Sequence, residues 1–415
     1  MLDLPAPPGI NPGPRTLRLL PLDQQQALDP YMQLIVGYRK SGLSLNHIIG
    51  CPLDCGYCVR HFWGNFDDKT PQLLVSTNEA IELLVNHAAF QPHVTPVQLF
   101  NKATDPFLPG VKPHLFQVLR ALDERGYTNH ILIITRFTVT ATDMAVLESL
   151  KHLKVTLLFT YSGITDSRVE PIVKSDITVR SIKTAAAHRG RTKVILYWRP
   201  IVPGWNDDPD TMAGVLEIGR DVDSIVFTGY YHKEENAAFL RGLGVQVPYG
   251  DDFARRKVMP GELDAKVIAA WRASGVATPL YRKTSCGVSA AHQVADYNGH
   301  WGVQELCDIC PNAQRQLCAD AHRTPTGQDI DDIMQRLGFD SRHLIVDGHV
   351  WTTLPEQQRY AIQHALGFQT WTLDNPHFKG NHGRSLHGYD LTDVDRAELE
   401  RVRQILLAES MQDDD

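Results

Sequence analysis

The chain has 415 residues, 43% hydrophobic and 21% charged, a composition that permits one large α/β domain of about 250 residues plus smaller modules. Its net charge of −7 argues against tight, non-specific nucleic-acid binding, although a local basic groove would be compatible with it. Because no apolar run approaches the roughly 18 residues of a membrane span and no secretory signal is visible, we expect a cytoplasmic protein without a membrane partner.

The first segment, residues 1–43, is rich in proline near its start. Its prolines are Pro5, Pro7, Pro8, Pro12 and Pro14, followed by Pro21 and Pro30. Proline excludes a regular helix over the first part of this segment. We therefore expect an extended arm that wraps the following domain or is partly disordered.

The next motif is Cys51-Pro-Leu-Asp-Cys55-Gly-Tyr-Cys58, which follows an apolar run over residues 45–50. Three thiolates on one short loop can hold three irons of a [4Fe–4S] cluster and leave the fourth iron open to a small ligand. Structural cysteines or a zinc knuckle are the alternatives, although zinc sites usually pair their ligands two and two. The total of seven cysteines is odd, which fits metal ligation better than a full set of disulfides.

Apolar strands and amphipathic helices alternate after this loop. The expected strands are 45–50, 97–101, 130–135, 155–161, 193–198 and 224–230. The expected helices are 77–89, 112–125, 142–150, 178–188 and 210–220. This pattern indicates parallel β/α units buried on both faces, and so predicts an α/β fold with a partial (β/α)6 TIM barrel. Barrel chemistry lies at the C-terminal ends of the strands, where the cysteine loop falls.

Beyond the sixth strand the pattern weakens. Residues 232–260 are expected to be a polar loop, 262–273 a helix and 278–281 a last strand.

Polar motifs follow strands two to five. They are Asn101-Lys102-Ala103-Thr104-Asp105-Pro106, Thr135-Arg136-Phe137, Thr160-Tyr161-Ser162 with Glu170-Pro171, and Arg199-Pro200 with Gly204-Trp205-Asn206-Asp207. With the cysteine loop and Tyr57, this order of motifs resembles the radical S-adenosylmethionine (SAM) superfamily, in its spore photoproduct lyase-like branch of "DNA repair photolyase" proteins. The resemblance covers about residues 44–232. It implies that the cluster's open iron binds SAM, which is reductively cleaved to a 5′-deoxyadenosyl radical.

The resemblance also implies roles for individual residues. The SAM amine would be held by Asn101, Thr104 or Asp105, the carboxylate by Arg136, the ribose by Thr160 and Ser162, and the adenine by Tyr57. A guanidinium suits a carboxylate because it donates two parallel hydrogen bonds. The substrate-facing candidates are Asn101, Lys102, Arg199, Tyr230 and Tyr231, with Lys102, Arg199 and Tyr230 as catalytic candidates. Each could instead be a satisfied barrel residue.

Helix capping is the alternative for several of these residues. Thr104 and Asp105 could cap a helix at Lys112, and capping is the favoured interpretation for Asn206 and Asp207.

The chain also departs from the family in one respect. Spore photoproduct lyase is expected to carry a hydrogen-donating cysteine where this chain has Lys102-Ala103. The resemblance therefore does not transfer the substrate.

The remaining cysteines, Cys286, Cys307, Cys310 and Cys318, form the pattern C-x20-C-x2-C-x7-C. Four thiolates are one full ligand set, for an auxiliary [4Fe–4S] cluster or for zinc, with free thiols as the third possibility. Nearby His292, His300 or His322 could replace a ligand. Between these cysteines, residues 296–302 form an aromatic and polar turn that either closes the barrel mouth or packs Trp301 into a small core.

The C-terminal residues 327–415 are expected to form a helix (328–337), a hairpin about Asp347-Gly348, and helices over 356–366 and 393–407. They would make a winged-helix-like or peptide-recognition module, or a packing appendage; the basic stretch 377–387 would be a solvated loop. The expected organisation is thus an arm (1–43), a barrel (44–285), a four-cysteine module (286–326) and a C-terminal module (327–415).

Together these features predict a radical SAM enzyme that acts on a small molecule or a peptide and receives electrons from a reductant such as flavodoxin or ferredoxin. Nucleic-acid repair or base modification is the alternative reaction. An iron–sulfur or zinc binding protein without catalytic activity is the alternative class.

Overall fold

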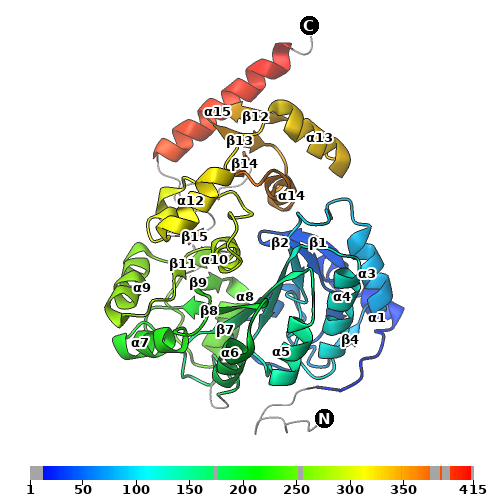
Figure 1. The fold of residues 1–415 in the computed structure, drawn as a ribbon, viewed down its shortest axis with the longest axis vertical. Helices are drawn as coiled ribbons and strands as arrows, with labels where there is room; N and C mark the ends of the chain where they lie inside the picture. The colour runs from blue at the N-terminus through cyan, green and yellow to red at the C-terminus, as the bar shows by residue number, and fades with distance from the viewer. Residues whose placement is uncertain are drawn as a thin grey trace.

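The computed structural model describes residues 13–171, 176–250, 256–346, 348–373, 384–385 and 393–412. A curled α/β domain forms the lower part of Figure 1, and the C-terminal elements lie above it. The first twelve residues, Asp347, and all but two residues of the basic stretch 377–387 lie outside the described residues.

One curled sheet organises the large domain. Six strands run parallel in sequence order: β2 (Gly42–Leu45), β5 (Val97–Leu99), β6 (His130–Thr135), β7 (Lys154–Tyr161), β8 (Lys193–Ile201) and β9 (Ser224–His232). Four more strands join them: β1 (Val36–Arg39), β10 (Arg256–Val258), β11 (Leu280–Tyr281) and β15 (Arg384–Ser385). Strands β1 and β10 are antiparallel to their neighbours β2 and β9. Over the described residues the sheet keeps two open ends, which confirms the predicted partial barrel.

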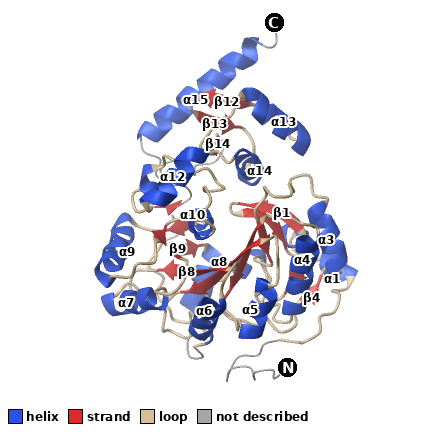
Figure 2. Ribbon diagram, in the orientation of Figure 1, coloured by secondary structure: helices blue, strands red, loops and turns tan. Residues whose placement is uncertain are grey.

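Helices cover the outer face of this sheet, as Figure 2 shows. They are α3 (Thr77–Val85), α4 (Lys112–Glu124), α5 (Ala141–Glu148), α6 (Ile177–His188), α7 (Pro209–Ile218) and α9 (Gly261–Ser274). Side chains alternate along a strand, so each strand serves two cores. Leu157 and Leu196 pack in the main core with the helices, whereas their neighbours Leu158 and Ile195 pack with Val288 of α10 (Thr284–Ala291). The inner face of the half-barrel is therefore filled in part by the segment that carries Cys286.

The predicted first strand, 45–50, is wrong in its bounds. The sheet strand ends at Leu45, and Ile48–Ile49 (β3) pairs with Gln72–Leu73 (β4) in a separate ribbon. Asn46 and His47 interrupt the run, because their buried side chains bind Lys102 N and Thr77 Oγ1 rather than a neighbouring strand. The hairpin of β1 and β2 also replaces the last part of the expected arm, and the boundary at residue 44 falls inside β2.

Residues 232–260 are not simply a polar loop. They contain α8 (Glu234–Gly242) and β10. The buried side chains Ala237 and Leu240 give α8 an apolar face, and Asn236 Oδ1 accepts a hydrogen bond from Lys233 N at its start. A Cβ atom at Gly56 would lie 2.5 Å from Leu240 Cδ2, so α8 presses directly on the cysteine loop.

The remaining elements are short or lie near the two ends of the chain. They are α1 (Leu22–Gln26), α2 (Pro30–Gln33), the 3-10 helix η1 (Val59–Trp63), α11 (Gln304–Cys307), α12 (Asn312–Ala321), α13 (Gly327–Leu337), β12 (His343–Val346), β13 (His349–Thr352), α14 (Glu356–Leu366), β14 (Thr370–Thr372) and α15 (Asp393–Gln412). The predicted C-terminal helices and hairpin are confirmed. The prediction lacked β14, which pairs in parallel with β13. The expected boundary at residue 286 falls inside α10.

The C-terminal elements are attached to the barrel by polar contacts. His364 Nδ1 of α14 lies 3.0 Å from Tyr38 Oη of β1. None of the helices in the described residues is long and apolar enough to cross a membrane.

Candidate functional site

The cysteine loop lines a pocket at the C-terminal ends of the parallel strands. The pocket has an empty volume of about 950 Å³, which includes space open to solvent. Its walls bring together most of the predicted residues: Cys51, Cys55, Tyr57, Cys58, Asn101, Lys102, Thr104, Asp105, Arg136, Thr160, Arg199, Tyr230 and Tyr231. Ser162 lies outside this pocket. The sequence did not point to Arg60, Thr228 or Lys257, which also line it.

The three thiols are fixed by the backbone around them. Cys58 N donates to Cys55 O at 3.0 Å, and Cys51 N donates to Asp68 O at 2.9 Å. Cys51 and Cys55 are buried and Cys58 is half-buried, and none of the three forms a disulfide. Burial raises the pKa of Cys51 to about 11, and the neighbouring Cys58 thiol acts in the same direction while Arg60 opposes it. Thiolates here need a compensating cation, so metal binding and deprotonation are coupled.

Arg60 is such a cation, and it also shapes the loop. Its side chain is 1% exposed. Its guanidinium donates to the carbonyl oxygens of Leu53 at 2.7 Å, Phe66 at 2.9 Å and Asp68 at 3.2 Å. These bonds hold both flanks of the loop, and the positive charge favours the thiolate form of the cysteines. The only feature of the sequence that could have pointed to Arg60 was its position as a basic residue two places after Cys58.

Arg136, Glu170 and Tyr57 form a buried polar group beside the thiols. Arg136 Nη1 lies 3.1 and 2.9 Å from the two carboxylate oxygens of Glu170, and it also donates to Tyr57 Oη. Tyr57 Oη in turn donates to Glu170. These bonds use one of the three guanidinium nitrogens, and Arg has five N–H donors. Arg136 is thus oriented by Glu170 and keeps donors for a ligand carboxylate.

Asp105 joins two strand ends. Its Oδ1 accepts from Thr135 Oγ1 at 2.7 Å and from Phe107 N at 2.9 Å, and its Oδ2 accepts from Arg136 N at 3.0 Å. It does not cap α4, whose first residue follows Val111 without a side-chain cap. The capping alternative is therefore wrong for Asp105, and the contacts give it the role of a tie between the loops after β5 and β6.

Asn101 is also bonded within the barrel. Ser44 Oγ donates to Asn101 Oδ1 at 2.6 Å, and Asn101 Nδ2 donates to Gln98 Oε1 at 2.5 Å.

Lys102 differs most from its predicted catalytic role. Its Nζ donates to the carbonyl oxygens of Tyr31 at 2.7 Å, Met32 at 3.2 Å and Leu34 at 2.8 Å. These three bonds use every hydrogen of an ammonium group. The side chain therefore fastens the N-terminal segment to the barrel. Burial lowers the pKa of Lys102 to about 7, and its predicted catalytic role stays a prediction.

Residues after β7 and β8 also differ from expectation. Ser162 Oγ accepts from Ile164 N at 3.1 Å and so shapes a turn away from the pocket. Asn206 binds Val202 N through Oδ1, and Asp207 binds Gly204 N, so both stabilise the loop before α7. The helix cap is Asp208, which accepts from Thr211 N at 2.9 Å. Capping by Asn206 or Asp207 is wrong.

Three hydroxyl groups in the pocket wall have no hydrogen-bond partner within the described residues. They are Thr104 Oγ1, Thr160 Oγ1 and Tyr230 Oη. A buried hydroxyl without a partner costs about 1–3 kcal/mol, so a polar ligand would stabilise this wall. The Arg199 guanidinium lies 3.9 Å from the centre of the Tyr197 ring at the same pocket. Three thiols, buried hydroxyls without a partner and an oriented guanidinium fit an iron–sulfur cluster with a polar, carboxylate-bearing ligand.

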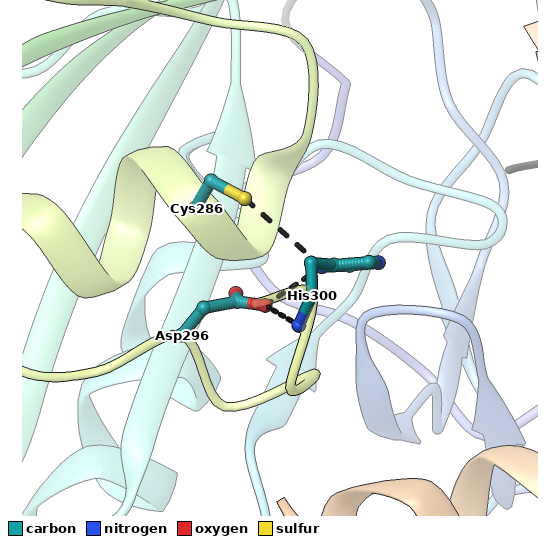
Figure 3. A group of neighbouring side chains, drawn as sticks. All are labelled: Cys286, Asp296 and His300. Carbon is teal, nitrogen blue, oxygen red and sulfur yellow. Dashed lines mark hydrogen bonds and ion pairs between the residues drawn. The ribbon is translucent and has the colours of Figure 1, made fainter. Parts of the chain in front are cut away.

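The second cysteine set gathers around the turn 294–300. Asp296 N donates to Cys318 Sγ at 3.4 Å, and Cys307 Sγ donates to His300 O at 3.7 Å. Figure 3 shows Cys286 on α10 facing His300, with 4.0 Å between Cys286 Sγ and His300 Nδ1. Asp296 Oδ2 lies 2.7 Å from the same nitrogen. Asp296, which sequence reasoning did not propose as a ligand, thus forms a cluster of possible ligands with Cys286 and His300.

The other two histidines have different surroundings. His292 Nε2 lies 2.9 Å from Thr156 Oγ1, and the His322 ring stacks on Phe368 with 5.1 Å between ring centres.

The sulfurs of each set lie within electrostatic range of one another. Cys51 and Cys58 both act on Cys55, and Cys307, Cys310 and Cys318 all act on Cys286. The fold therefore gathers each predicted set, and the choice between a cluster and zinc at the second set stays a prediction.

No protein-family model matches the chain, and no curated protein matches it. Solved structures with a similar arrangement include spore photoproduct lyase complexed with dinucleoside spore photoproduct, at 12% identity and a TM-score of 0.44, covering 59% of this chain and 78% of that one. They also include SuiB of Streptococcus suis bound to S-adenosylmethionine, at 10% identity and a TM-score of 0.41, covering 62% of this chain and 54% of that one.

Proposed function

We propose that the protein is a radical SAM enzyme. The observation that carries this proposal is the three-cysteine loop at the C-terminal strand ends, which lines one pocket with Arg136 and the residues of the three unpartnered hydroxyls. A [4Fe–4S] cluster on Cys51, Cys55 and Cys58 would supply the electron that cleaves SAM into methionine and a 5′-deoxyadenosyl radical.

The chain's own residues would bind and orient SAM. Arg136, fixed by Glu170, would donate to its carboxylate. Thr104, Thr160 and Tyr230 would bind its polar groups, and Tyr57 would contact the adenine. Asn101 Oδ1 and Asp105 Oδ2 each accept one hydrogen bond from a neighbouring strand and keep a second lone pair, with which either would accept from the SAM amine.

The test is anaerobic reconstitution of the full chain with iron and sulfide, followed by dithionite and SAM. We expect release of 5′-deoxyadenosine from the wild type and none from Cys51→Ala/Cys55→Ala/Cys58→Ala. If the reconstituted wild type holds iron and still cleaves no SAM, the enzymatic proposal fails. The protein would then be an iron–sulfur binding protein.

We also propose that Cys286, Cys307, Cys310 and Cys318 hold a second [4Fe–4S] cluster. The electrostatic proximity of the other three thiols to Cys286 supports this, with Asp296 and His300 as neighbours that would tune or replace a ligand. Iron and sulfide analysis of the wild type should give about eight irons, and the triple variant above about four. About four in the wild type and none in the variant would leave zinc or thiols at the second set.

The substrate would be a small molecule or a peptide, with a nucleic-acid lesion as the alternative, and a flavodoxin or ferredoxin would supply electrons. One similar structure, SuiB, is described as bound to precursor peptide SuiA, and spore photoproduct lyase as complexed with a dinucleoside photoproduct. The residues in this chain favour a small molecule or a peptide over a nucleic-acid lesion, because Lys102-Ala103 stand where the lyase is expected to carry a hydrogen-donating cysteine.

A further inference from the structure

Basic side chains line the cysteine pocket on several sides, and most of them are held by other groups. Arg60 and Lys102 donate to carbonyl oxygens, and Arg136 pairs with a carboxylate. Lys257 also has an interaction of its own. Arg199 is half-buried in the same wall, and the described residues give its guanidinium neither a hydrogen bond nor an ion pair. Its N–H donors are therefore available to a ligand.

The end of β8 sets the position of the Arg199 side chain. Strands β8 and β9 change register between Trp198 and Ile201, so Arg199 stands at an irregularity of the sheet. Such bulges re-aim a side chain and are common beside active sites. The guanidinium lies over the Tyr197 ring, 3.9 Å from its centre. This contact bonds no N–H to an oxygen, so the planar group can still donate two parallel bonds to a carboxylate or a phosphate.

Arg199 stands where two cavities meet. It lines the cysteine pocket, whereas Tyr197 lines a second cavity with an empty volume of about 430 Å³, including space open to solvent. Thr228 of β9 lines both cavities and is 6% exposed. Its hydroxyl has no hydrogen-bond partner within the described residues. Because a buried hydroxyl without a partner is unfavourable, Thr228 and Arg199 both indicate a ligand with acceptor oxygens at this junction.

The position of Arg199 separates it from the carboxylate of SAM. In the proposed function, the open iron would bind SAM beside the three thiols. Arg60 acts to lower the pKa of Cys51, against the effect of burial. Arg136 acts in the same way on the pKa of Cys55, and Arg199 is not among the groups that act most strongly on either thiol. Arg136 is thus the guanidinium beside the cysteine loop, and Arg199 is placed for a different anion.

We propose that Arg199 binds an anionic group of the substrate, a carboxylate or a phosphate, with Thr228 Oγ1 as a second donor. The rest of the substrate then extends from this junction into the cysteine pocket. The inference rests on the proposed function and deepens it, because it names the chemistry of the substrate end that is held away from the thiols. It makes the substrate an acid or a phosphate ester.

The test is anion binding by the reconstituted full chain, kept oxidised so that SAM is not cleaved. Calorimetry is done with inorganic phosphate and, separately, with acetate, each with and without SAM. We expect one saturable site for at least one anion under both conditions, and the tighter anion indicates which group is natural. Arg199→Met should weaken binding about tenfold or more, the value of one charge-assisted hydrogen bond. Arg199→Lys should restore only part of it, because an ammonium lacks the planar fork.

Arg120→Met is the matched control. Arg120 is exposed on α4, outside the pocket, and the described residues give its side chain no hydrogen bond or ion pair either. Its replacement should leave anion binding unchanged. Iron content and the free energy of unfolding show whether each variant keeps its fold. No saturable binding of either anion, or equal binding in the wild type and Arg199→Met, would overturn the subsite.

SAM binding, measured by equilibrium dialysis on the same oxidised samples, separates substrate from cofactor. Arg199→Met should keep the SAM affinity of the wild type, whereas Arg136→Gln should weaken it. Loss of SAM affinity in Arg199→Met, or displacement of phosphate and acetate by SAM, would overturn the proposal, because Arg199 would then hold the SAM carboxylate. Anion binding needs no reductant, so the subsite can succeed where 5′-deoxyadenosine release fails, and the reverse.

Discussion

The first cysteine set lines an open pocket, whereas the second lies in a loop clamped by the C-terminal elements. Cys51, Cys55 and Cys58 face the hydroxyls and guanidinium of the strand ends. Around the second set, Asn298 O accepts from Gln363 Nε2 at 3.0 Å and from Gln369 Nε2 at 2.7 Å. The first set thus shares a pocket with predicted ligand-binding residues, whereas the loop that carries the second set is held by hydrogen bonds from the C-terminal elements.

Removal of one ligand from the open set should have the largest effect. Cys58→Ala should abolish 5′-deoxyadenosine release and lower the iron content by about half, because a three-thiolate loop has no ligand to spare. The iron that remains should belong to the second set. If both sets lose their iron together, the two sites are not independent, and the contrast between the two cysteine sets is wrong.

Arg136→Gln should lower SAM cleavage in the pocket without changing the iron content of the second set. It leaves the Glu170 carboxylate buried without its guanidinium, a loss of about 3–5 kcal/mol for a buried pair. The free energy of unfolding, measured with urea under anaerobic conditions, should fall by this amount, and SAM cleavage should fall with it. Arg136→Lys keeps the charge and should recover stability more than SAM affinity. Unchanged stability in the glutamine variant would contradict the ion pair.

The clamp of the second set depends on Gly299. It has φ of +63°, and a Cβ atom there would lie 2.2 Å from Gly367 O. Gly299→Ala should lower the free energy of unfolding by about 2–5 kcal/mol, from left-handed strain plus the displaced backbone. The second set should lose iron while 5′-deoxyadenosine release persists.

Gly338 is the matched control for this substitution. Its φ is +67°, with nothing within 4 Å of a Cβ atom. Gly338→Ala should lower the free energy of unfolding only by the strain of a left-handed alanine, about 1–2 kcal/mol. It should leave the iron content unchanged. Equal losses in the two variants would show that Gly299 is not a close contact.

Local pattern predicted the barrel and the two cysteine sets, because apolar strands, helices and cysteine spacing are properties of neighbouring residues. Features that depend on distant residues were missed. Glu170 was part of a motif, but only the fold places it against Arg136. Asp296 meets Cys286 through the turn at Gly299. The cap at Asp208, one residue from the predicted pair, shows that short-range signals fix a helix start only approximately.

Lys102→Met should have the smallest effect on the chemistry, and it decides between the predicted and the observed role of this residue. The ammonium binds three carbonyl oxygens at residues 31, 32 and 34. Methionine keeps most of the side-chain volume but leaves those oxygens unpaired, so the free energy of unfolding should fall by about 1–3 kcal/mol. Release of 5′-deoxyadenosine per cluster should stay near the wild-type value, because no bond of Nζ reaches the thiols. Unfolding by urea and SAM cleavage, measured on the same iron-quantified sample, separate the two roles. Lost cleavage at unchanged stability would support the predicted catalytic role of Lys102. Lower stability at unchanged cleavage would show that Lys102 holds the N-terminal segment against the barrel.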